Sequence, residues 1–178
     1  KLHRASVRRS EHRFLVEGAN AVRAALDTGR AETLLVRSRD ADRHTDLLTS
    51  ADRAGVPVLE ISDRAAAKLT ETSTAPGIFA VSGLLDARLD DVLAAQPRLL
   101  AVAVEPREPG NAGTLIRCAD AMGADAVVLL GDSVDPHNGK CVRASAGSVF
   151  HLPVVRERDV LEGMAVISSA GLTTLATA

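Results

Sequence analysis

The stretch EPREPGNAGTLIRCADAMGADAVVLL, residues 105–130, decides the fold, because it joins a turn, a helix and a buried strand. An apolar run, Leu99–Val104, precedes it and predicts another buried strand. A loop rich in Pro and Gly then leads to Asn111, which the pattern predicts as a helix N-cap. The run Ala126–Leu130 predicts the strand that ends the unit.

The predicted helix carries one apolar stripe. Spacings of 0, +3, +4 and +7 predict that the stripe faces the core, and its members are Leu115, Cys118, Ala119 and Met122. Arg117 lies about 200° around the helix from Leu115, so we expect it to point away from the core. Its neighbours at helical spacing are small, which leaves room for a large ligand; they are Gly113, Thr114 and Ala121.

A second stretch, DPHNGKCVRASAGSVFHLPVV (residues 135–155), places two cations before a run of tiny residues. The cations are Lys140 and Arg143, and the tiny residues are Ala144, Ser145, Ala146, Gly147 and Ser148. Tiny residues allow the backbone to approach a ligand or another segment closely. An apolar segment, Phe150–Val155, follows and predicts a strand.

These two stretches resemble a known family. N-A-G-T-x-x-R-x-A-x-A-x-G-A (from Asn111) and K-x-x-R-A-S-A-G-S-x-F-x-x-P (from Lys140) are similar to the first two signature motifs of SpoU/TrmH proteins. That family, part of the SPOUT superfamily, contains RNA ribose 2′-O-methyltransferases that use S-adenosylmethionine. Its third motif, a Gly-Asn-Glu turn followed by a Ser-Leu-Asn helix start, is not in these 178 residues. We therefore expect a chain that is cut or disordered beyond Ala178, and its first residue, Lys1, predicts a missing start.

The remaining segments alternate between strands and helices, which predicts an α/β fold. The predicted strands are Arg13–Glu17, Glu32–Val36, Pro57–Ile61, Ile78–Ser82 and Leu172–Thr177. The predicted helices are the stripe Ala19, Val22, Ala25 and Leu26, then Thr45–Ala54, Asp63–Thr70 capped by Ser62, Leu89–Ala95 and Asp159–Ser169. FLVEG with a helix, then GVPV, LT-x-T and PGIFAV, is similar to the small α/β/α RNA-recognition domain that many SpoU/TrmH proteins place before the catalytic domain.

The resemblance implies two α/β domains. We expect an RNA substrate-binding domain with a basic arm at residues 1–83, a linker at 84–98 and a partial SPOUT methyltransferase domain at 99–178. In the family this second domain is a trefoil knot, a rare exception to the rule that chains do not thread loops.

The resemblance also implies roles for individual residues. Arg117 would be catalytic, holding the substrate phosphate and the 2′-hydroxyl; the base stays open, since a guanidinium has a pKa above about 12. Asn111 would orient Arg117 or the RNA, or only cap the helix. Cofactor contacts are expected from Leu130, Gly131, Ser145, Gly147, Leu175 and Ala176. RNA contacts are expected from Arg4, Arg8, Arg9, Arg13, Lys140 and Arg143.

Simpler interpretations stand beside these roles. Arg117 could pair with Asp120 on the surface, and Lys140 and Arg143 could be a solvated basic pair. Ser145 and Gly147 could serve tight helix packing. Glu105 could hold Arg107 or Arg117.

Composition narrows the function classes. The formal net charge is −2, yet residues 1–13 hold five cations against Glu11 alone, which fits a phosphate-binding arm. Three Phe with no Trp or Tyr argue against base-stacking platforms. The glycine pattern matches neither a dinucleotide fingerprint nor a phosphate loop, and the five His show no metal-ligand spacing. Cys118 and Cys141 are expected to be reduced thiols in a cytoplasmic protein, with no membrane or secretion segment.

The resulting prediction is an S-adenosylmethionine-dependent ribose 2′-O-methyltransferase that acts on ribosomal RNA and forms a homodimer. Two alternatives remain open: a tRNA 2′-O-methyltransferase, and an RNA-binding protein without catalysis. Titration with S-adenosylmethionine separates the last from the others, since a pure RNA binder shows no cofactor heat.

Overall fold

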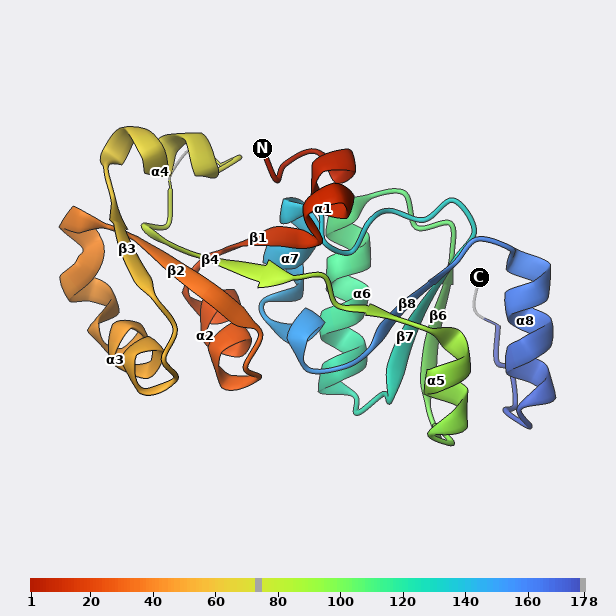
Figure 1. Ribbon diagram of the computed structural model, residues 1–178. Helices are drawn as coiled ribbons and strands as arrows, with labels where there is room; N and C mark the ends of the chain where they lie inside the picture. The colour runs from red at the N-terminus through yellow and green to blue at the C-terminus, as the bar shows by residue number, and fades with distance from the viewer. Residues whose placement is uncertain (73–74, 177–178) are drawn as a thin grey trace.

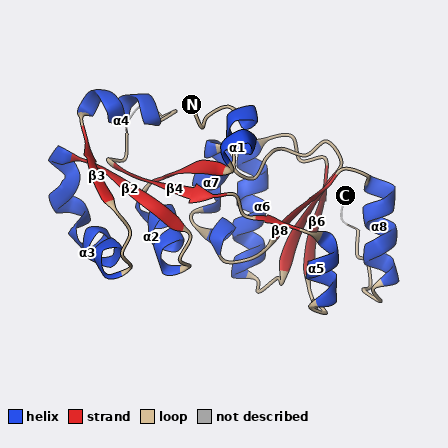
Figure 2. Ribbon diagram, in the orientation of Figure 1, coloured by secondary structure: helices blue, strands red, loops and turns tan. Residues whose placement is uncertain are grey.

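The computed structural model describes residues 1–72 and 75–176. Two α/β units lie next to each other, each built on a four-stranded sheet (Figure 1). The strand order is β1-β4-β2-β3 in the first sheet and β5-β8-β7-β6 in the second. Figure 2 shows the helices covering both sheets. The α/β fold class predicted from the sequence is confirmed.

The first sheet is mixed, because β4 runs antiparallel to β1 and β2 while β2 and β3 are parallel. Helices α2 and α3 lie below this sheet in Figure 1, and α4 lies above it. The cap predicted at Ser62 is confirmed, since its hydroxyl accepts a hydrogen bond from the Ala65 N–H at 3.3 Å. The elements are β1 Arg13–Glu17, α2 Ala19–Asp27, β2 Ala31–Arg37, a 3-10 helix η1 Ser38–His44, α3 Thr45–Arg53, β3 Val58–Ile61, α4 Asp63–Leu69 and β4 Ile78–Gly83.

The second sheet is parallel throughout. Its strand β7 (Ala126–Leu130) is fully buried, which explains the continuous apolar run in the sequence. Residues 84–98, the expected linker, contain β5, an edge strand of this sheet, and α5, which packs on it. The other elements are β5 Asp86–Ala87, α5 Leu89–Ala94, β6 Leu100–Val104, α6 Pro109–Ala121, α7 Gly139–Ser145, a 3-10 helix η2 Ser148–Phe150, β8 Val154–Glu157 and α8 Val160–Ser169.

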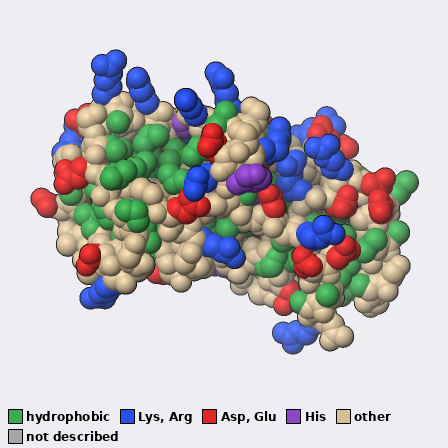
Figure 3. Space-filling view, viewed as in Figure 1, with side chains coloured by type: hydrophobic (Ala, Val, Ile, Leu, Met, Phe, Trp, Pro, Cys, Tyr) green, Lys and Arg blue, Asp and Glu red, His purple; other side chains and the backbone are tan. Residues whose placement is uncertain are grey.

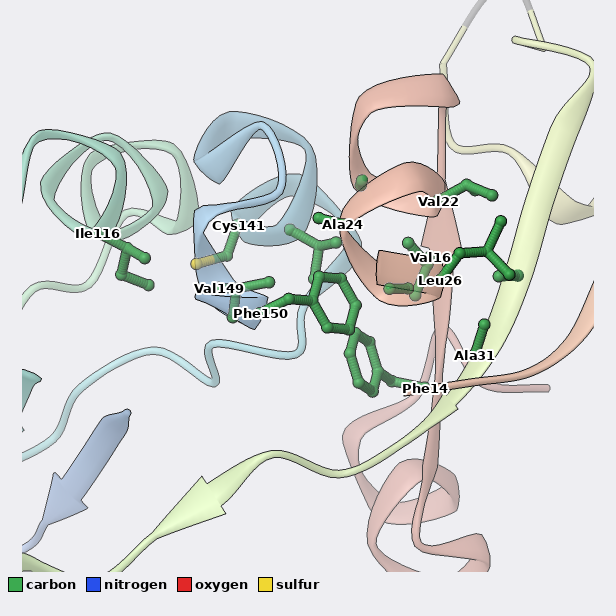
Figure 4. Packing of buried hydrophobic residues seen from close by; sticks show 14 of the residues in the cluster. Phe14, Val16, Val22, Ala24, Leu26, Ala31, Ile116, Cys141, Val149 and Phe150 are labelled. Carbon is green, nitrogen blue, oxygen red and sulfur yellow. The ribbon is translucent and has the colours of Figure 1, made fainter. Parts of the chain in front are cut away.

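One apolar cluster continues from the first unit into the second. Phe14 of β1 stacks on Phe150 of η2, with ring centroids 5.9 Å apart (Figure 4). A Cβ added at Gly147 would lie 3.0 Å from the Ala24 Cβ of α2, so the backbone approaches α2 closely there. The two units therefore share a core, which limits their motion against each other.

Two predicted strands are wrong. In place of Phe150–Val155, a 3-10 turn holds Phe150 against Phe14, and the strand starts only at Val154. Phe150 is apolar because it fills the contact between the units. Of Leu172–Thr177, residues 172–176 form no strand, since they make no ladder hydrogen bonds to a neighbour, and Thr177 lies outside the described residues.

A helix that the sequence pattern did not predict, α1 (Ala5–Glu11), forms most of the basic N-terminal segment. It is short, but Arg8 anchors it from inside, because this side chain is 3% exposed. In the described part of the chain, no helix is long and apolar enough to cross a membrane.

Candidate functional site

The carboxyl ends of the parallel strands β6 and β7 form the first part of the site. Val104 and Leu130 are paired at these ends, and the next residue of each strand turns sharply. Glu105 has φ 48° and Gly131 has φ 73°, and the Glu105 N–H donates to the Leu130 carbonyl at 2.9 Å. Ligands of parallel sheets bind at this edge, so the turns mark a candidate site.

The turn after β7 has no space for a side chain. A Cβ at Gly131 would lie 2.8 Å from the Glu105 Cγ and 3.0 Å from a Val160 methyl carbon. Leu130 is fully buried, and its carbonyl also accepts the Ser133 hydroxyl at 2.6 Å. Of the two predicted cofactor residues here, Leu130 and Gly131, only Gly131 is partly exposed.

Helix α6 begins earlier than the sequence predicts. Pro109 occupies its first turn and Glu108 is the N-cap, because proline has a φ suited to a helix start. The prediction of Asn111 as the N-cap is therefore wrong. Asn111 lies inside the first turn with an exposed side chain.

The predicted inward stripe of α6 is right for Ala119 but wrong for Cys118 and Met122. The buried positions are Ala112, Gly113, Ile116 and Ala119. Cys118 and Met122 are exposed, Met122 by 77%, and Leu115 is half-buried. Two apolar stripes with the same spacing exist on this helix, and the smaller residues let it approach the sheet and α7 more closely.

Gly113 is the contact point between α6 and α7. A Cβ there would lie 2.4 Å from the Cys141 carbonyl oxygen and 2.7 Å from the Ala144 Cβ. The small residue thus serves helix packing and does not open space beside Arg117. Burial raises the pKa of the Cys141 thiol to about 12, so it stays protonated and unreactive.

Arg117 is exposed on α6. Within residues 1–72 and 75–176 its guanidinium has no hydrogen bond or ion pair. Asp120, its alternative partner, instead contacts His151, whose Nδ1 lies 2.8 Å from the carboxylate. A free guanidinium presents a planar fork of donors that matches phosphate or carboxylate oxygens.

The two predicted RNA contacts on α7 have different surroundings. Lys140 has an exposed side chain, and its Nζ pairs with the carboxylate of Glu108, the N-cap of α6, at 3.0 Å. Arg143 instead donates to the buried Glu17 of β1 at 2.6 Å, so it joins the two units.

Ser145 and Gly147 are both buried. The Ser145 hydroxyl donates to the Val142 carbonyl at 2.8 Å, and Gly147 packs on α2. Tight packing therefore describes both residues, and their expected cofactor contact has no support in this geometry.

The four N-terminal arginines that were expected to contact RNA differ in their burial and in their partners. The prediction of an RNA contact is wrong for Arg8, whose buried guanidinium binds Asp135 and the carbonyls of Leu2 and His3. Arg13 is exposed but pairs with Glu32. Exposed Arg4 and Arg9 have no side-chain partner among the described residues.

An open groove of about 420 Å³ lies beside the edge strand β6, between the strand, α8 and residues 171–175. Leu175 is 87% exposed and Val104 58%. Leu175, one of the expected cofactor contacts, lines this groove, whereas Leu130, another of them, is buried. Ala176 is exposed as well.

Two family models match the chain. Residues 98–178 match the SpoU rRNA methylase family, and residues 1–80 match the MRM3-like substrate binding domain. The second unit of this chain therefore matches the SpoU rRNA methylase family. The SpoU segment contains β6, α6, β7 and α7, and so includes both Arg117 and the turn at Gly131.

Relatives of this chain have names that state an activity. The 23S rRNA (guanosine(2553)-2′-O)-methyltransferase RlmP of Bacillus subtilis is 40% identical over 157 residues, which cover 88% of this chain and 59% of the relative. The 23S rRNA (guanosine-2′-O-)-methyltransferase RlmB of Vibrio cholerae is 29% identical over 172 residues, covering 92% and 70%. The chain thus spans about three fifths of the length of the Bacillus protein.

Solved structures resemble the SpoU fold described above. AviRb from Streptomyces viridochromogenes, solved with the cofactor AdoMet, has a TM-score of 0.79 at 27% identity, covering 94% of this chain and 64% of that one. An AdoMet-bound rRNA methyltransferase from Sinorhizobium meliloti has a TM-score of 0.78 at 29% identity, with coverage of 95% and 63%.

Proposed function

We propose that this chain belongs to an enzyme that transfers a methyl group from S-adenosylmethionine to a ribose 2′-hydroxyl of ribosomal RNA. The observation that carries the proposal is Arg117, an unpaired, exposed arginine within the segment that matches the SpoU family. The Bacillus relative named for this reaction adds support, since its identity of 40% extends across both units.

The carboxyl edge of the second sheet fits one side of the cofactor. Exposed Val104 offers apolar surface, the turn at Gly131 lets the backbone approach a ligand, and Glu105 supplies a carboxylate. S-adenosylmethionine supplies an electrophilic methyl group on a sulfonium centre when it is bound. Val104, Glu105 and Gly131 are the described residues that would hold it.

Arg117 performs the positioning in this proposal. Its guanidinium binds two oxygens of a backbone phosphate and thereby fixes the adjoining ribose. Holding the hydroxyl in line with the methyl group supplies much of the rate enhancement, because the entropy cost of bringing the reactants together is met on binding. The hydroxyl loses its proton as its oxygen gains the methyl group. Asn111, exposed on the same helix α6 before Arg117, offers an amide to the same RNA.

The test is transfer of labelled methyl groups to ribosomal RNA by the purified protein. We expect label in RNA, resistance of the modified linkage to alkali, and heat on titration with S-adenosylmethionine. RNA binding without cofactor heat and without label would contradict the proposal and favour the RNA-binding alternative. Label found only in tRNA would exclude ribosomal RNA as the substrate.

We also propose that the enzyme is a cytoplasmic homodimer. Uncovered apolar side chains support a dimer, among them Leu161 on α8 at 83% exposure and Met122 at 77%. Two free cysteines and a ribosomal substrate suit the cytoplasm. Sedimentation equilibrium tests the dimer, and a monomer at micromolar concentration would contradict it.

A further inference from the structure

A line of Lys and Arg side chains follows the edge of the molecule over α4 and α1 (Figure 3). We define the α1–α4 ridge as Lys1, Arg4, Arg64 and Lys68, all of which are exposed. Within the described ranges, none of the four side chains has an ion pair or hydrogen bond. Many other exposed cations are paired with carboxylates, as Arg23 is with Asp46.

The geometry of α4 directs two ridge residues outward. Ala66 is fully buried and faces the sheet. Arg64 and Lys68 lie two residues before and after it, about 160° around the helix, so both point to solvent. Their spacing of four residues puts them on one face.

The N-terminal segment continues the ridge from α4. The His3 Nε2 lies 3.4 Å from the Lys68 carbonyl oxygen, and its Nδ1 lies 3.4 Å from a Glu71 carboxylate oxygen. His3 thereby places Arg4 beside the end of α4. Arg8 then fixes α1 to Asp135 of the second unit at 2.6 Å, so the ridge has a set position relative to α6 and α7.

From the ridge the contacts lead to the candidate site. The Glu71 carboxylate lies 3.9 Å from Arg143 of α7. Lys140, also on α7, extends over the first turn of α6, where its Cε would lie 3.5 Å from a Cβ at Gly110. Arg117 lies two turns further along α6. These contacts connect α4 and the N-terminal segment with α7 and the first turn of α6, the helix that carries Arg117.

We propose that the α1–α4 ridge binds the phosphate backbone of the substrate RNA and leads it to Arg117. The inference rests on the proposed function and adds α4 to the RNA contacts. Cations without carboxylate partners can bind phosphates without breaking an ion pair, and phosphate contacts fix the position of a nucleic acid. The chain has no Trp or Tyr, which favours contact with the backbone over stacking on bases.

The experiment compares Arg64→Gln/Lys68→Gln with a control of equal charge, Arg30→Gln/Arg53→Gln. The control residues are exposed, have no ion pair among the described residues, and follow or end α2 and α3 on the other side of the sheet. Binding of the protein to a synthetic ribosomal RNA hairpin is measured between about 50 and 200 mM salt. The log–log slope should fall by about 1.4–1.8 in the ridge variant, because each lost phosphate contact removes about 0.7–0.9.

Equal slopes in the ridge variant and the control would overturn the inference that the ridge binds RNA. If the unchanged protein still binds and methylates RNA in that case, the proposed function stands. Failure of the unchanged protein both to bind and to methylate RNA would overturn both. Vesicles with anionic lipids serve as a second probe. Loss of vesicle binding with unchanged RNA binding would assign the ridge to a membrane surface and also overturn the inference.

Discussion

The Arg8 guanidinium donates two hydrogen bonds to one oxygen of Asp135, from Nε at 3.1 Å and from Nη2 at 2.6 Å. The two residues are 127 positions apart in the chain and belong to different units. Arg8 is almost completely buried, and its remaining donors reach the carbonyls of Leu2 and His3. The pair thereby orders the N-terminal segment and fixes α1 on the loop between β7 and α7.

Replacement of Arg8 should destabilise the protein. Arg8→Met leaves the Asp135 carboxylate partly buried without its guanidinium, and breaking such a pair costs about 3–5 kcal/mol. The matched control is Arg9→Met on the same helix, where the exposed side chain has no partner in the described residues and the expected change is below about 0.5 kcal/mol. Urea unfolding measures both, and equal losses would show that the Arg8 pair contributes nothing.

The same pair predicts an acid limit of stability. Despite its burial, hydrogen bonds from His137 and Arg8 hold the pKa of Asp135 far below its usual value. A lowered folded-state pKa stabilises the protein above the unfolded-state pKa, near 3.9, and this stability is lost as pH falls further. The free energy of unfolding should therefore drop below about pH 4 in the unchanged protein. The drop should be smaller in Arg8→Met, and identical pH profiles would contradict the assignment.

The contact between α6 and α7 should tolerate no side chain at Gly113. Gly113→Ala brings a methyl group onto the Cys141 carbonyl and the Ala144 methyl, and overpacking of this kind costs about 1–3 kcal/mol. Gly110→Ala, in the same helix, meets only the flexible Lys140 side chain and should be neutral or stabilising. Thermal unfolding of the two variants checks the difference. A stable Gly113→Ala protein would mean that the two helices separate easily.

Arg143 and Lys140 should differ in their effect on stability. Arg143→Met leaves the buried carboxylate of Glu17 without its charge partner, which should lower the free energy of unfolding by about 3 kcal/mol. Lys140→Met breaks only an exposed pair with Glu108, worth less than about 1 kcal/mol. If Arg143→Met instead unfolds like the unchanged protein and only weakens RNA binding, Arg143 is an RNA contact as the sequence predicted.

The sequence predicts the strands of the first sheet within one or two residues, because their apolar runs are short and bounded by Gly or Pro. It misplaces the strand β8 because Phe150 is apolar for another reason, namely its contact with Phe14 of the other unit. It misassigns the buried face of α6 because Ala112 and Leu115 begin stripes of equal spacing. Local spacing alone does not show which of the two stripes is buried, because that depends on where α7 packs.

The site residues divide in a similar way. The motif around Arg117 predicts an exposed arginine, and the exposure is confirmed. The partners of Arg8 and Arg143 lie 127 and 126 residues away in the chain. No local pattern shows that these two cations form ion pairs between the units. The acidic residues Glu17 and Asp135 were therefore missed, although Asp135 is the first residue of the second stretch, residues 135–155.

The most direct test of the account is the methylation rate of Arg117 variants. Arg117→Ala should lower methyl transfer to ribosomal RNA by a factor of about 10² or more, because a contact made in the transition state is lost. Arg117→Lys should recover only part of the rate, since an ammonium lacks the planar fork. Both variants should keep the thermal stability and S-adenosylmethionine affinity of the unchanged protein, because the side chain has no partner in the described chain. Full methylation by Arg117→Ala, or loss of activity only through early unfolding, would contradict the central role of Arg117.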